Sequence, residues 1–106
     1  MKNIRVGSKE KIHFIGIGGI GMSGLAQVMQ TMGFQVQGSD LSQNKNVERC
    51  KKIKIKIFSK HSAKNIKEVT IVVRSSAIKD NNVEILTAKK KKIKIFKRAE
   101  MLGHVV

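Results

Sequence analysis

The stretch HFIGIGGIGMSGLAQVM, from His13 to Met29, decides the fold of this chain of 106 residues. It begins inside a dense apolar run over residues 11–17, which is typical of a buried strand. The run ends on glycines in the spacing GxGxxG: Gly16, Gly18 and Gly21. Between a strand and a helix, this pattern predicts a turn that holds the diphosphate of NAD, FAD or another nucleotide.

A helix is expected after the glycines, over about residues 19–32. Four apolar side chains in it recur at spacings of three, four and three residues, which places them on one buried stripe: Met22, Leu25, Met29 and Met32. Gly33 then stands where helices commonly end.

Strands and helices alternate along the rest of the chain. Further strands are expected at residues 34–39, 54–58, 69–75 and 92–96. Further helices are expected at residues 45–52, 79–92 and from 98 onward, and Asp80 or Asn81 is expected to cap the second of them. No linker interrupts the alternation. It predicts that residues 1–106 form one α/β domain, a Rossmann-like three-layer fold with a parallel sheet of about five strands.

Each glycine of the loop has an expected task. Gly16 makes the tight turn, Gly18 lets the backbone approach a pyrophosphate, and Gly21 allows the helix to pack closely on the sheet. The free N–H groups at the helix start, together with the helix dipole, attract the anion. The alternative is a tight turn that binds nothing.

Polar side chains follow the other strands at the same edge of the sheet, where open α/β sheets bind ligands. Asp40 comes 24 residues after Gly16, where a carboxylate commonly accepts hydrogen bonds from a ribose 2′-OH; the alternative is a turn or cap carboxylate. His61, Ser75 and Ser76 follow two later strands. From chemistry alone, His61 is expected to be a solvated loop histidine and Ser75 a cap.

The sequence holds no Ser/His/Asp order, no HExxH and no phosphate-binding GxxxxGK[ST], so no catalytic residue and no metal site is expected in it. Cys50 is its single cysteine, which excludes an internal disulfide. No apolar run reaches the roughly 20 residues of a membrane span. We therefore expect a cytoplasmic domain with no membrane partner.

The chain is strongly basic, with 22 Lys and Arg against 7 Asp and Glu. A nucleic-acid surface is one explanation. The aromatic content of 4% offers little to stack on bases, and the lysines alternate with isoleucine over residues 51–58 and 89–97. These patterns favour a composition bias with solvated lysines, and make nucleic acid an improbable partner.

Four motifs in register extend the glycine pattern: IHFIGIGGIGMSGLAQVM, GFQVQGSDL, VVRSSAIKDNNVEI and KRAEML. Together, from about Ile12 to Leu102, they resemble the amino-terminal domain of the Mur ligase family of peptidoglycan synthesis. Within that family, the loop looks most like that of the members that add L-alanine to UDP-N-acetylmuramate. It looks less like that of the members that attach recycled tripeptide.

The resemblance implies a UDP-sugar ligand, UDP-N-acetylmuramate. The diphosphate would lie on the loop formed by Gly16, Ile17, Gly18, Gly19, Ile20 and Gly21, and the uridine near Asp40, His61, Ser75 and Ser76. ATP would phosphorylate the lactyl carboxylate, with Mg²⁺ bridging the phosphates, and L-alanine would attack the acyl phosphate. The family keeps its ATP- and Mg²⁺-binding groups in a central domain, so this domain is expected to need no cofactor and to be inactive alone. Arg98 and Glu100 match the motif that leads to that central domain.

Two departures from the family pattern stand out. Arg74 precedes the serines where a small apolar residue is expected, and prolines are missing near Gln43, Val83 and Lys94. A stand-alone NAD- or nucleotide-binding module remains the alternative, since the glycines and Asp40 suffice for it.

Overall fold

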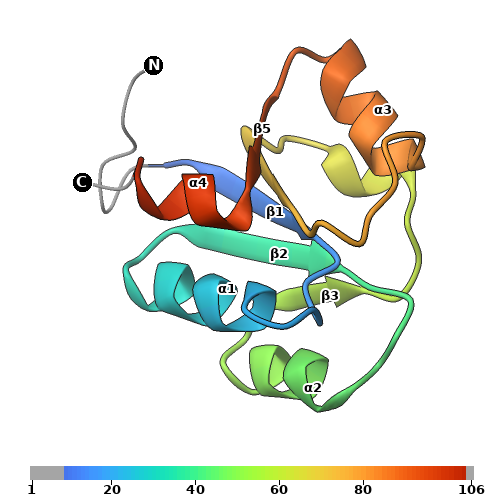
Figure 1. The fold of residues 1–106 in the computed structure, drawn as a ribbon. Helices are drawn as coiled ribbons and strands as arrows, with labels where there is room; N and C mark the ends of the chain where they lie inside the picture. Colours follow the sequence, from blue (N-terminus) through green and yellow to red (C-terminus); the bar gives the residue numbers. More distant parts are fainter. Residues whose placement is uncertain (1–8, 105–106) are drawn as a thin grey trace.

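The structure is a computed structural model that describes residues 9–104. Five parallel strands form one sheet in the order β3-β2-β1-β4-β5 (Figure 1). The strands are β1 (Lys11–Ile15), β2 (Gln35–Ser39), β3 (Lys56–Phe58), β4 (Ile71–Arg74) and β5 (Lys94–Lys97). The helices are α1 (Met22–Thr31), α2 (Lys45–Lys52), the 3₁₀ turn η1 (Ala63–Ile66), α3 (Val83–Lys90) and α4 (Arg98–Leu102). The predicted fold class is confirmed.

Two hydrophobic cores lie on opposite faces of the sheet, which makes the domain three layers thick. On β4, Val73 belongs to one core and its neighbour Val72 to the other, as the alternation of a strand requires. The first core includes side chains of α1, α2 and α4, among them Leu25, Cys50 and Met101. The second contains Ile66 of η1 with Ile85 and Ala88 of α3.

Two glycines with positive φ make β1 and α1 shorter than the sequence predicts. Gly16 has φ +82°, so β1 ends at Ile15 rather than at residue 17. Gly21 has φ +79° and is the N-cap of α1, which therefore begins at Met22 rather than near residue 19.

The prediction of Asp80 or Asn81 as the cap of α3 is wrong. Asn82 is the N-cap, and its side-chain oxygen accepts a hydrogen bond from the N–H of Glu84. Asp80 instead pairs with Arg74, Oδ1 to Nη1 at 2.6 Å. That hydrogen bond lowers the pKa of the Asp80 carboxyl.

The two lysine–isoleucine segments contain β3 and β5, which are the two edge strands. Lysine along an edge strand hinders pairing with the sheet of another molecule. Lys56 and Lys94 are both exposed there. The lysines of β3 and β5 therefore lie on opposite edges of the sheet and do not form one continuous basic stripe.

Candidate functional site

The glycine loop lies at the carboxyl end of β1 and is held by the segment that follows β2. The N–H of Gly18 donates to Oδ2 of Asp40 at 2.8 Å, and the side-chain amides of Asn44 and Asn46 both donate to the Gly18 carbonyl at 3.1 Å. Both backbone groups of Gly18 are thus occupied by protein.

The space beside Gly18 is also filled by protein. A Cβ at this position would lie 2.9 Å from Asp40 Oδ2 and from Val47 Cγ2. In the free domain this glycine therefore admits the β2–α2 segment, and the approach of its backbone to a pyrophosphate stays a prediction. Gly38, which no motif indicated, allows another close approach: a Cβ there would lie 2.5 Å from Ile17 Cδ1.

Asp40 closes a turn as well as the loop. Its Oδ1 accepts from the N–H of Ser42 at 2.8 Å, while its Oδ2 accepts from Gly18. The turn-carboxylate alternative therefore describes its geometry in the free domain. Its role as a partner of a ribose hydroxyl stays a prediction.

A hollow of about 210 Å³ opens on the other side of the loop, between the carboxyl ends of β1, β4 and β5. Three cationic side chains contribute to its lining: Arg74, Lys97 and Arg98. Ile20, Ser75 and Ser76 line it too. Within residues 9–104, the N–H groups of Ile20 and Gly21 have no hydrogen-bond partner. Positive charge in the hollow, with the unpaired N–H groups of Ile20 in its lining and of Gly21 next to it in the chain, suits an anion.

Arg98 lies against the loop itself. A Cβ on Gly21 would lie 2.9 Å from Arg98 Nε, so this glycine makes room for the guanidinium of α4 rather than for the sheet. Glu100 fixes the start of the same helix by accepting from the N–H of Lys97 at 2.8 Å. The RAEML motif thus places a cation at the glycine loop.

The serines behave partly as expected. Ser75 Oγ accepts from the N–H of Ala77 at 3.2 Å, which confirms a turn-capping role, and Ser76 is exposed at the hollow. The Arg74 guanidinium, besides Asp80, donates to the carbonyl of Ile78. This bracing holds the loop after β4.

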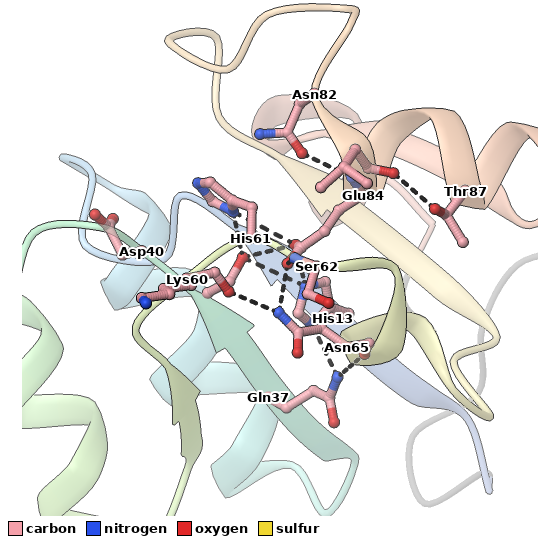
Figure 2. Close-up of polar contacts among 12 residues, drawn as sticks. His13, Gln37, Asp40, Lys60, His61, Ser62, Asn65, Asn82, Glu84 and Thr87 are labelled. Atoms are coloured by element: carbon pink, nitrogen blue, oxygen red, sulfur yellow. Dashed lines mark hydrogen bonds and ion pairs between the residues drawn. The ribbon is translucent and has the colours of Figure 1, made fainter.

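A buried polar network under the same edge of the sheet was not predicted (Figure 2). Its centre is Glu84 of α3, whose side chain is fully buried. Oε1 lies 2.6 Å from His13 Nε2 and accepts from Ser39 Oγ at 2.7 Å. Oε2 accepts from the N–H of Ser62 at 3.0 Å and from Asn65 Nδ2 at 2.7 Å. Four donors therefore surround one carboxylate.

These donors decide the charge of Glu84. Burial alone would raise its pKa, but the hydrogen bond and electrostatic attraction of His13, with the hydrogen bonds from Ser39 and Asn65, outweigh burial and lower the pKa from 4.5 to about 2. Glu84 is therefore an ionised acceptor in the interior at neutral pH.

His61 joins this network, and the expectation of a solvated loop histidine is wrong. Its side chain is 14% exposed, and Nδ1 lies 2.9 Å from Ser39 Oγ. Ser39 ends β2 directly before Asp40. The structure thus brings Ser75 and Ser76 to the hollow together with Ile20 of the loop, while Asp40 and His61 follow the adjacent strands β2 and β3.

No group of three His, Cys, Asp or Glu side chains among residues 9–104 is arranged to hold a metal ion. In the same range, no helix has the length and apolar character to cross a bilayer.

A family model described as "Mur ligase family, catalytic domain" matches residues 11–106. The chain belongs to the Mur ligase family. A UDP-N-acetylmuramate–L-alanine ligase of Pelagibacter ubique is 60% identical over 103 residues, which cover 97% of this chain and 22% of that protein. The enzyme of the same name from Rickettsia bellii is 53% identical over 97 residues, or 92% of this chain and 20% of its own length.

Solved structures of ligases share the fold of this chain. The UDP-N-acetylmuramate–alanine ligase of Thermotoga maritima matches with a TM-score of 0.82 and 37% identity, over 87% of this chain and 21% of that one. A Neisseria ligase for a tripeptide matches with a TM-score of 0.81 over 90% of this chain and 30% of that one, but at 22% identity it shows the fold alone. The chain spans about a fifth of the length of the curated relatives it matches.

Proposed function

We propose that this chain is the amino-terminal, UDP-N-acetylmuramate-binding domain of a ligase that adds L-alanine to that substrate. The observation that carries the proposal is the cation-lined hollow beside the glycine loop. A diphosphate brings two negative charges, which Arg98, Lys97 and the N–H groups of Ile20 and Gly21 would neutralise together.

The names of the relatives support the choice of substrate and of amino acid. Relatives at 53% and 60% identity carry the L-alanine ligase name, whereas the tripeptide ligase reaches 22%. In this proposal ATP, Mg²⁺ and L-alanine are bound elsewhere in a longer protein. The domain itself holds the nucleotide end of the substrate, and we infer a cytoplasmic location from the ATP that such a ligase consumes.

The stand-alone NAD module gains less support. The Mur ligase family model covers residues 11–106, including the segments after β4 and β5 that an NAD module leaves unexplained. The hydrogen bond between Gly18 and Asp40 does not separate the two functions, because both assign these residues to a nucleotide.

Calorimetry on this chain tests the proposal, with UDP-N-acetylmuramate, UDP, uridine and NADH as separate ligands. We expect heat with the first two, much weaker binding of uridine because it lacks the diphosphate, and none with NADH. Binding of NADH alone would overturn the proposal. A duplex DNA titration at low salt checks the nucleic-acid alternative, for which we expect no binding.

A further inference from the structure

Ser39 stands between the buried carboxylate and the histidine at the edge of the sheet. Its Oγ lies 2.7 Å from Glu84 Oε1 and 2.9 Å from His61 Nδ1. These two contacts connect Glu84 of α3 with His61 in the segment after β3. A serine hydroxyl has a single proton, so it can donate along only one of the two contacts.

The ionised carboxylate decides which contact receives the proton. Glu84 is an acceptor only, so Ser39 must donate to it, because two oxygen lone pairs facing each other at 2.7 Å would repel. The Ser39 oxygen is then left as an acceptor toward His61. His61 must therefore carry its proton on Nδ1.

The other side of the network keeps Glu84 in this role. The Gln37 amide nitrogen lies 2.7 Å from the Asn65 carbonyl, which can only accept, and 2.8 Å from His13 Nδ1. Gln37 therefore donates to Nδ1 of His13, and the imidazole proton is on Nε2, directed at Glu84 Oε1. Every donor around the carboxylate is thus fixed in orientation.

We propose that Glu84, acting through Ser39, is a positioning residue that holds His61 in its Nδ1–H tautomer. Nε2 of His61 then presents a lone pair to the ligand edge. Within residues 9–104 it has no hydrogen-bond partner, and Figure 2 shows the second ring nitrogen directed away from the network. The side chain reaches the surface, with 14% of it exposed.

This tautomer selects a ligand group that donates a hydrogen bond. In a uridine nucleotide those groups are the ribose hydroxyls and the N3–H of the base, whereas phosphate oxygens would be refused. This part of the inference rests on the proposed function. The tautomer itself does not, so the two can fail separately.

Long-range ¹H–¹⁵N NMR spectra of this chain measure the tautomer directly, because protonated and bare ring nitrogens have distinct ¹⁵N shifts. We expect His61 to be in the Nδ1–H form in the unchanged chain. In Ser39→Ala the population should move toward the Nε2–H form that a free histidine side chain prefers, because Glu84 Oε1, at 3.7 Å from Nδ1, is beyond hydrogen-bond distance. Ser23→Ala removes another buried serine outside the network and should change nothing. A wild-type His61 in the Nε2–H form, or no response to Ser39→Ala, overturns the proposal.

Glu84→Gln provides the second variant. A carboxamide can donate as well as accept, so Ser39 is no longer compelled to donate toward residue 84, and the Nδ1–H share of His61 should fall. If this variant fails to fold, Ser39→Ala still decides the question, because it leaves three of the four donors on Glu84 in place.

Calorimetry with UDP, 2′-deoxy-UDP and N3-methyl-UDP then identifies the donor. The analogue that lacks it should bind the unchanged chain about 3–10-fold more weakly than UDP, the range of one neutral hydrogen bond. In Ser39→Ala that difference should disappear. Equal binding of all three by the unchanged chain overturns the acceptor role of His61. Absence of UDP binding overturns the proposed function and leaves the NMR result to judge the tautomer.

Discussion

Nε2 of His13, in β1, lies 2.6 Å from Oε1 of Glu84, in α3, although 71 positions separate the two residues in the chain. The contact ties the central strand to the helix that covers one face of the sheet. Because both side chains are fully buried, its loss would leave an unsatisfied polar group in the interior. The geometry of the ligand edge and the stability of the domain therefore depend on the same carboxylate.

Acid should destabilise the domain through Glu84. Its pKa is about 2 in the folded chain against an ordinary 4.5, so its contribution is complete above pH 4.5 and is lost as the pH falls toward 2. The slope is about 1.4 kcal/mol per pH unit in that window. Urea unfolding at pH 7 and pH 3 measures this loss in the free energy of unfolding. Glu84→Gln should lower stability at pH 7 and flatten the difference between the two pH values, whereas Glu68→Gln, at an exposed carboxylate, should leave that difference nearly unchanged.

The N-cap of α3 should contribute to the stability of the domain through Asn82 and not through Asn81. Asn82→Ala removes the acceptor of the Glu84 N–H and should lower the free energy of unfolding by about 1 kcal/mol. Asn81→Ala, one residue earlier and exposed, should cost less than half of that. Thermal or urea unfolding of both variants checks this difference. Equal costs at the two positions would contradict the assignment of the cap.

The sequence predicts the framework well because glycines and apolar periods act locally. Strand, loop and helix around Gly16 are found where the pattern indicates, with ends shifted by two or three residues. The buried network was missed because Glu84 stands in the first turn of α3, where an acidic residue is common for its interaction with the helix dipole. A signal existed: His13, Gln37 and Ser39 are polar in strands that parallel sheets normally fill with apolar residues. That signal shows that a polar partner is needed, but the partner depends on how α3 crosses the sheet.

The site could be predicted in its residues more than in its geometry. Of the predicted site residues, Ile20, Ser75 and Ser76 line one hollow, and ligand binding at them stays a prediction. Arg98 lies over Gly21 because β5 ends and α4 begins at this point of the chain. No local sequence pattern specifies that boundary. Likewise, the bond from Gly18 to Asp40 joins two residues that the motif assigns separately to a ligand.

Two glycines should respond to alanine in opposite directions. Gly38→Ala places a Cβ 2.5 Å from Ile17 Cδ1 and 2.9 Å from the Phe14 carbonyl, so it should destabilise the domain by about 1–3 kcal/mol. Gly24→Ala, in α1 with nothing within 4 Å, should stabilise it by about 0.5–1 kcal/mol through helix propensity. Urea unfolding at pH 7 measures both. A neutral Gly38→Ala would show that β2 and the glycine loop lie further apart than described.

Arg98 should contribute to ligand binding and little to folding. It is exposed and lies beside the loop N–H groups, where it can donate to a phosphate oxygen. Arg98→Ala should weaken UDP binding about 10-fold or more, since a hydrogen bond between charged groups contributes about 1.5–3 kcal/mol. Lys90→Ala removes the same charge in the last turn of α3, at the other end of the strands, and should leave the affinity within about 2-fold. Calorimetry at two salt concentrations separates the local contact from the general positive charge. If both variants lose affinity equally, the hollow beside Gly21 is not where the diphosphate binds.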